Sequence, residues 1–186
     1  FSNWDNTIWS FYDDSVEGFA VNIRPYLKNI TAEIDKPTTF LLFSQGFGTE
    51  ANPYGITNWT QLQNINNYSV ITKNYHFDLL NDLNSSTLGY ASEVKDDETL
   101  ANNGMGWKII GKDNPNNLVS EKFSGTFDGL GHTIDSLIIY IPSFINVTLD
   151  GQFVGLFAET DNAIIKNIGL TNIDVTGIDA VGGLVG

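Results

Sequence analysis

The chain has 186 residues and a formal net charge of −13, from 22 acidic and 9 basic residues. This acidic field repels nucleic acid and anionic lipid, and the basic residues form no patch that could neutralise a row of phosphates, so nucleic-acid binding is excluded. A hydrophobic content of 41% with 12% aromatic residues is enough for one core, which excludes a wholly disordered chain.

Cysteine is absent, so the chain has neither a disulfide framework nor thiol chemistry. No apolar run approaches the roughly 20 residues that a membrane-spanning helix needs, and we therefore predict no membrane insertion. The chain begins at Phe1 and its only methionine is Met105. We expect that a leader has been removed or that the chain is a fragment of a longer protein.

The first 55 residues are aromatic and strand-like, with apolar runs at residues 7–11, 20–23 and 39–43, but they match no repeat. A terminal coil exposes unpaired backbone and needs a cover. We therefore predict that residues 1–56 form irregular first coils or a cap.

Two kinds of segment follow this N-terminal part. Residues 59–62 are expected to form a strand or short helical turn, and residues 75–82 a strand. Residues 84–106 form a polar excursion, and residues 111–122 a second loop. The excursion carries an acidic cluster made of Glu93, Asp96, Asp97 and Glu98. A loop of this length is unusual unless it has a function, so we expect it to take part in recognition.

Short apolar runs ended by Gly, Asn or Asp repeat in the last third of the chain. Residues 123–127 (FSGTF) recur as residues 153–157 (FVGLF) and again as residues 181–185 (VGGLV), at offsets of 30 and 28. This alignment places the repeat glycines in one vertical column, where a side chain would crowd the core or the neighbouring coil. The column consists of Gly125, Gly155 and Gly183. The alternative is that they belong to unrelated hairpins.

A second register repeats in step, because residues 134–139 (IDSLII) return as residues 165–170 (IKNIGL). Ile134 and Leu137 are three residues apart, whereas Leu137 and Ile139 are two apart. The inward residues of a flat strand keep steps of two, so a step of three marks a corner. Each repeat then has about three short strands, and stacked repeats rise about 4.8 Å per turn. We predict an all-β, right-handed parallel β-helix (solenoid) over residues 57–186 that continues beyond the last residue.

The order of these segments and their glycines resembles the GLUG-motif region of large secreted bacterial exoproteins. Residues 107–111 (WKIIG), 123–137, 154–157 and 165–170 look like this region, and residues 181–186 (VGGLVG) resemble the motif itself. The resemblance covers roughly residues 57–186 and implies a parallel β-helix. The family includes filamentous-haemagglutinin-type adhesins, related surface proteins and the non-catalytic part of some immunoglobulin A-cleaving metallopeptidases. It supplies no catalytic residues.

Enzymatic chemistry finds little support in the sequence. His76 and His132 do not form the H-E-x-x-H pattern of a zinc protease, and His132 is expected to cap or pack against a coil corner. A polysaccharide lyase or hydrolase on a β-helix is the stronger alternative, and a hydrolase needs a pair of carboxylates. Asp128, Asp135 and Asp150 are candidates by position. Turn chemistry, which favours Asp and Asn, is the preferred interpretation, so we predict no enzymatic activity.

The acidic cluster of the excursion could bind calcium, whose ligands are carboxylates and carbonyls. No EF-hand loop accompanies it, so a solvated loop is favoured and no cofactor is predicted. The sequence therefore predicts a non-catalytic segment of an adhesin, extracellular or at the bacterial cell surface. Its expected partners are host or neighbouring cells and their glycans. The alternatives are a carbohydrate-active β-helix enzyme and a spacer domain of a secreted metallopeptidase.

Overall fold

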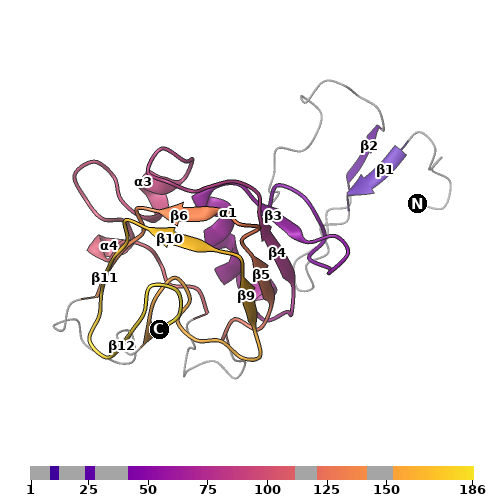
Figure 1. Cartoon of the computed structure of the whole chain (residues 1–186). Helices are drawn as coiled ribbons and strands as arrows, with labels where there is room; N and C mark the ends of the chain where they lie inside the picture. Colours follow the sequence, from indigo (N-terminus) through magenta and orange to yellow (C-terminus); the bar gives the residue numbers. More distant parts are fainter. Residues whose placement is uncertain (1–8, 13–23, 28–41, 112–120, 142–152) are drawn as a thin grey trace. The chain divides into compact units, whose positions relative to one another are not determined.

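The computed structural model describes residues 9–12, 24–27, 42–111, 121–141 and 153–186 (Figure 1). The chain divides into two compact units, Phe1–Leu41 and Leu42–Gly186. In the first unit, β1 (Trp9–Tyr12) pairs antiparallel with β2 (Arg24–Leu27). β1 overlaps the strand predicted at residues 7–11, whereas the strand predicted at residues 20–23 lies outside the described residues. Whether residues 1–56 form a cap stays a prediction.

The second unit consists mainly of short parallel strands. Its four-stranded sheet has the order β3 (Tyr54–Ile56), β4 (His76–Leu79), β5 (Thr126–Asp128) and β9 (Ile164–Lys166), and all neighbours are parallel. Three further parallel pairs join β6 (Thr133–Asp135) to β10 (Gly169–Thr171), β7 (Ile138–Tyr140) to β11 (Asp174–Thr176), and β8 (Phe153–Val154) to β12 (Ala180–Val181). The predicted predominance of parallel β-strands is confirmed, whereas the short helices described below depart from an all-β chain.

We call β5, β6 and β7 one pass of the chain, and β9, β10 and β11 the next. The strands of one pass lie beside those of the next in the same order. β5, β6 and β7 pair with β9, β10 and β11, respectively. Successive side chains of a strand point to opposite faces, so one column of each pair points inward. Phe127, Ile134 and Ile139 occupy these inward positions and are buried. The two passes therefore stack on one another over a shared apolar interior.

The structure corrects the predicted alignment of the repeats. Ile134 lies beside Leu170, 36 residues further on, and not beside Ile165. The bend between β5 and β6 has four residues and the bend between β9 and β10 has two, so the offset changes from strand to strand. The paired strands of this region are only two or three residues long, so the sequence pattern by itself does not fix the offset between them.

The predicted glycine column is corrected at Gly125 alone, because the bridge between Phe157 and Val185 keeps Gly155 and Gly183 in one register. Gly125 accepts a hydrogen bond from the N–H of Ile164 at 3.0 Å, and so it lies beside the start of β9. Gly155 instead lies in the pass that pairs with Gly183, whose carbonyl accepts from Leu156 N–H at 3.1 Å. A Cβ at Gly125 would lie 2.3 Å from the carbonyl oxygen of Tyr75. The reason for a glycine at each of these positions therefore depends on the atoms that surround that position.

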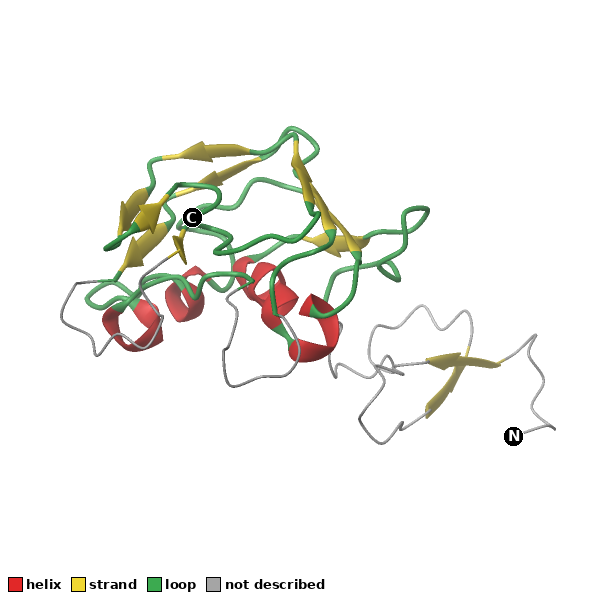
Figure 2. Cartoon of the chain, turned by 90° about the horizontal axis from the view of Figure 1, so that it is seen from below, coloured by secondary structure: helices red, strands yellow, loops and turns green. Residues whose placement is uncertain are grey.

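Short helices lie together along one side of the second unit (Figure 2). They are α1 (Trp59–Gln63), the 3-10 helix η2 (Asn64–Asn66), α2 (Tyr68–Ile71), α3 (Tyr90–Glu93) and α4 (Ala101–Gly104). At α1, the side chain of Asn58 accepts a hydrogen bond from Gln61 N–H, which satisfies one free donor of the first turn. The segment predicted as a strand or helical turn is therefore helical.

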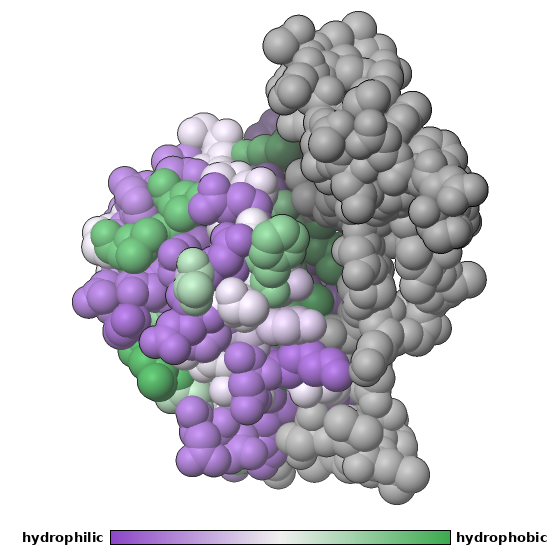
Figure 3. All heavy atoms as spheres, turned by 90° about the vertical axis from the view of Figure 1, so that its right-hand side faces the viewer, coloured by the Kyte–Doolittle hydropathy of each residue, from purple (hydrophilic) through white to green (hydrophobic). Residues whose placement is uncertain are grey.

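The interior of the second unit is a run of aromatic and aliphatic side chains. Trp59 and Trp107 have ring centroids 5.6 Å apart, and Phe123 and Phe157 have centroids 4.9 Å apart. Every fully buried side chain among the described residues is hydrophobic. On the face shown in Figure 3, apolar residues are scattered among hydrophilic ones. Among the described residues, no helix combines the length and the hydropathy required to cross a bilayer.

Candidate functional site

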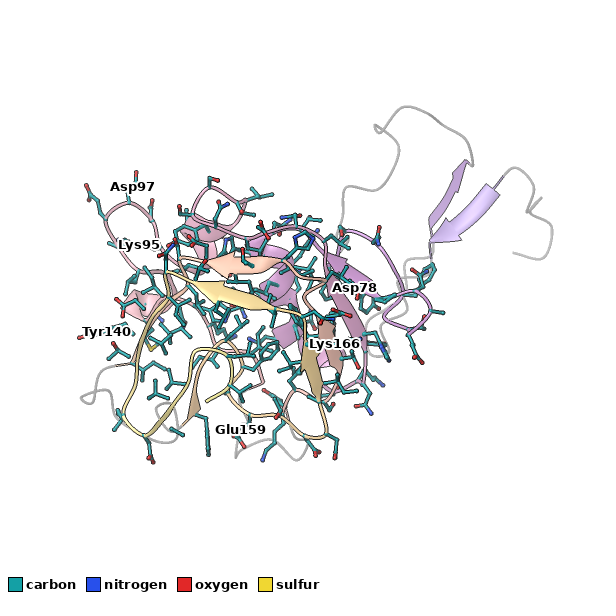
Figure 4. All side chains as sticks on the ribbon, viewed as in Figure 1. Asp78, Lys95, Asp97, Tyr140, Glu159 and Lys166 are labelled. Atoms are coloured by element: carbon teal, nitrogen blue, oxygen red, sulfur yellow. The ribbon has the colours of Figure 1, made fainter. Side chains whose placement is uncertain are left out.

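A column of charged side chains crosses the outer face of the four-stranded sheet. The register places Asp78 beside Asp128, and Asp128 beside Lys166. The neighbouring position, Phe127, is buried, so these three side chains point outward. Lys166 Nζ lies 3.0 Å from Asp128 Oδ2, and Asn167 Nδ2 donates to Asp128 Oδ1 at 3.0 Å. Figure 4 shows Asp78 and Lys166 on this sheet.

The two carboxyl groups of the column have pKa values shifted in opposite directions. Partial burial, followed by the negative charge of Asp128, raises the pKa of Asp78. Burial also raises the pKa of Asp128. Hydrogen bonds from Leu130 N–H, Asn167 and Lys166 together outweigh this effect, so the pKa of Asp128 is lowered. Adjacent carboxyls with unequal pKa values can act as an acid/base pair, although structural ion-pair networks produce the same pattern.

A second polar group ties two passes of the chain together at a corner. Asp135 Oδ2 accepts from Thr171 Oγ1 at 2.8 Å and from Asn172 Nδ2 at 2.6 Å, both on the next pass. Its Oδ1 accepts from Ser136 Oγ at 2.5 Å. These hydrogen bonds, that from Ser136 first, lower the pKa of Asp135. Asp135 is therefore an acceptor that links stacked corners.

His132 lies in the bend between β5 and β6. Its Nδ1 is 3.2 Å from Asp82 Oδ1, and the same oxygen accepts from Thr133 N–H at 2.8 Å. The hydrogen bonds from Thr133 and then His132 lower the pKa of Asp82. His76, the other histidine, lies on β4. Within the described residues, no three His, Asp or Glu side chains are grouped so that they could hold a metal ion.

The carboxylates considered from sequence are distributed over separate places. Asp128 belongs to the charged column and Asp135 to the corner, while Asp150 lies outside the described residues. Sequence reasoning missed Asp78 and Lys166, because only the parallel register brings them to Asp128 from distant parts of the chain. One sequence signal could have indicated the position of Asp78. It follows the apolar Phe77 in a strand of alternating residues, which predicts that the Asp78 side chain points outward.

The excursion at residues 84–106 is fastened to the body of the unit at its base. Tyr90 Oη donates to the carbonyl of Ser136 at 2.9 Å. Trp59 donates twice, from its backbone N–H to Leu88 O at 3.1 Å and from Nε1 to Asn84 O at 2.9 Å. The excursion therefore projects from a fixed position on the stacked strands.

The acidic residues of the excursion do not form one group. Glu93 lies at the end of α3, and its Oε1 accepts from Thr60 Oγ1 of α1 at 3.3 Å. Asp96, Asp97 and Glu98 are exposed at the tip, between bridge partners at residues 95 and 100. Figure 4 shows Asp97 projecting from this tip. The tip is therefore open to a partner.

A polar hollow of about 280 Å³ lies where three separate segments meet. It is lined by Ile71, Thr72, Asn74, Lys122, Ser124, Asp161 and Asn162. At its side, Lys122 Nζ lies 2.7 Å from Glu159 Oε2. Hydroxyl, amide and charged groups around a small hollow can hydrogen-bond a polar ligand such as a sugar ring.

Similarity to known proteins is confined to parts of longer chains, and no family model matches the chain. The chain is 35% identical over 149 residues to a protein of Evansella cellulosilytica named "Putative Gly-rich membrane protein", covering 78% of the chain and 14% of that protein. It is 33% identical over 142 residues to "Halomucin" of Haloquadratum walsbyi, covering 76% of the chain and 1% of that protein. Among solved structures, that of a "putative immunoglobulin A1 protease" from Bacteroides ovatus has a TM-score of 0.47 and 22% identity over 72% of the chain and 30% of that protein.

Proposed function

We propose that the chain is a non-catalytic structural and binding segment of a large bacterial adhesin, at the cell surface or secreted. We further propose that it folds as a right-handed parallel β-helix with GLUG-type repeats. The observation that carries this proposal is the stacking of β5, β6 and β7 on β9, β10 and β11. The right hand is the usual one for connections between parallel strands. Each coil of such a stack contacts only its neighbours, which gives an extended scaffold.

Two further observations support a place in a long surface protein. The chain spans only 14% and 1% of the two relatives, so the matched region is a small part of each of them. One relative is named a membrane protein and the other a halomucin. The proposed location is tested by proteolysis of intact source cells, followed by mass spectrometry of the released peptides. Release of peptides from residues 42–186 supports the location, and their release only after cell lysis contradicts it.

We assign recognition of host or neighbouring cells, through surface glycans, to the excursion and the polar hollow. The excursion has a fixed base and an exposed tip, and the hollow offers hydroxyl and amide groups. In the test, labelled chain is applied to cells and to a glycan array. The first variant replaces residues 96–99 by two glycines, and the second carries Asn74→Ala with Ser124→Ala.

The expected result is binding by the parent chain and its loss in at least one variant, with unchanged circular dichroism. A matched control is Asp174→Asn on β11, which lies outside both regions. Binding that neither variant affects would contradict this assignment. Absence of binding to every cell and glycan tested would count against adhesion itself.

A carbohydrate-active β-helix enzyme is the second candidate, and the unequal Asp78 and Asp128 carboxyls are the observation that favours it. Reducing-sugar and unsaturated-product assays on acidic and neutral glycans test this candidate. Turnover that disappears in both Asp78→Asn and Asp128→Asn would replace the non-catalytic proposal. The spacer alternative requires an H-E-x-x-H motif elsewhere in the parent polypeptide, which the full-length gene decides.

A further inference from the structure

The two ends of the stack of parallel strands differ in how their edges are covered. At one end, the backbone of β3 is bonded by the segment before it: Ser44 N–H donates to Gly55 O at 2.8 Å, and Gly55 N–H donates to Gln45 O at 2.9 Å. At the other end, β9, β10, β11 and β12 each have a strand partner on one side only within the described residues. Among the residues that the structure describes, a row of backbone donors and acceptors without a strand partner therefore lines the second end.

The inward side chains at the second end are only partly covered as well. Phe127 is 0% exposed, whereas its register neighbour Ile165 is only partly buried. Val154 is likewise 0% exposed, whereas its register neighbour Val181 is 45% exposed. The other inward residues of the last pass that are only partly buried are Ile168, Leu170, Ile173, Val175 and Leu184. An apolar face bordered by unpaired strand edges is favourable for adding another strand layer.

We propose that this open face, formed by β9, β10, β11 and β12, is the assembly surface for one further parallel β-coil of the same polypeptide in the longer protein. The inference rests on the proposed function, because it requires the chain to be a segment of a larger surface protein. The added coil has apolar residues over Ile165, Leu170 and Val175. It has an acidic residue over Lys166, whose side chain is 51% exposed and has donors besides the one directed at Asp128.

The covered end argues against a second copy as the occupant. A head-to-tail contact between copies needs the open face of one molecule and a free edge at the opposite end of the next. In the four-stranded sheet, the opposite edge is already bonded to Ser44 and Gln45 through Gly55 of β3. A further coil instead extends the ladders that join β5 to β9 and β6 to β10 in the same parallel direction. Both relatives are much longer than the region that matches this chain.

The test adds one coil to the chain. Phe157 and Val185 are bridge partners 28 residues apart, so a second copy of residues 159–186, which has 28 residues, is joined directly after Gly186. The copy carries Lys166→Asp, which places an acid over the original Lys166. We expect a monomer whose Tm is higher by about 5 °C or more. Amides of β9, β10 and β11 should exchange at least about tenfold more slowly than in the unextended chain.

Two controls use the same 28-residue extension. In the first, Ile165→Ser, Leu170→Ser and Val175→Ser are introduced into the copy alone, and both gains should be lost. In the second, the copy keeps its lysine, and the gain in Tm should be smaller because like charges face one another. An extended chain that is no more stable and no better protected than the serine control would overturn the proposal.

The unextended chain provides an independent measurement that does not depend on how the extension folds. Its β9–β12 amides should exchange faster than those of β5–β7, and light scattering should give a monomer. Equal protection of both sets, or a dimer that protects β9–β12, would show that the face is covered without a further coil and would refute the inference. Cell and glycan binding are measured separately, so a failure of adhesion is distinguishable from a failure of coil addition.

Discussion

Phe127 and Ile165 are register neighbours on β5 and β9, yet Phe127 is completely buried and Ile165 is only partly buried. Phe127 has a strand on each side, β4 and β9, whereas in the described part of the chain Ile165 has a strand only on the side of β5. Local stability should therefore fall from the middle of the stack toward β9, because fewer apolar contacts hold the outer strand.

Truncation of these two neighbours should have unequal effects. Phe127→Ala leaves a cavity in the interior and should lower the free energy of unfolding by about 3–5 kcal/mol. Ile165→Ala removes contacts on one side only and should cost less than about 2 kcal/mol. Urea unfolding followed by tryptophan fluorescence measures both values. Equal losses would mean that the outer column is as well packed as the inner one.

Two glycines offer a comparison of backbone and side-chain crowding. A Cβ at Gly125 would lie 2.3 Å from the carbonyl oxygen of Tyr75, and this oxygen accepts from Thr126 N–H in the ladder. Gly125→Ala should therefore destabilise the protein by about 1–3 kcal/mol. At Gly169 the nearest atom is the side-chain Cγ2 of Thr133 at 2.9 Å, which can rotate away, so Gly169→Ala is the matched control and should cost less. The two thermal unfolding midpoints decide the order.

One of the hydrogen bonds that fasten the excursion can be removed alone. Tyr90→Phe deletes the donor to the carbonyl of Ser136 and should lower the free energy of unfolding by about 1 kcal/mol. Limited proteolysis should also cut residues 84–106 faster. The control is Tyr140→Phe at an exposed side chain, which should have little effect. Equal proteolysis of both variants would show that the excursion is held by other contacts.

The stability contributed by Asp135 should depend on pH in a defined direction. Its pKa is lower in the folded chain than the value of about 3.9 expected when unfolded, because Ser136, Thr171 and Asn172 donate to its carboxylate. The stabilisation is therefore present above about pH 4 and is lost as pH falls through the lowered folded pKa. Asp135→Asn should be less stable than the parent at pH 7, and the difference should shrink toward pH 2.

Denaturant midpoints across this pH range measure the effect of Asp135. The control is Asp97→Asn at the exposed tip of the excursion, which should show no comparable difference at pH 7. A stability difference for Asp135→Asn that stays constant from pH 7 to pH 2 would contradict a role for the ionised carboxylate.

The sequence by itself determined the local features of this protein. Alternation of apolar residues located the strands around Phe127 and Ile139, because the inward and outward faces of a strand differ at every second residue. The step of three between Ile134 and Leu137 marked a bend, and Ser136 within it has a φ of 64°. Alternation and the step of three depend only on residues that are close in sequence, so both can be recognised without knowing the tertiary structure.

Only the tertiary structure decided which strands lie side by side. It paired Ile134 with Leu170 because the bend before β6 is longer than the bend before β10, and the sequence pattern does not measure that difference in register. The same pairing brought Asp78, Asp128 and Lys166 into one column from distant parts of the chain. Contacts between passes depend on how the bends close in space, and therefore the charged column and the uncovered last pass could be found only in the folded chain.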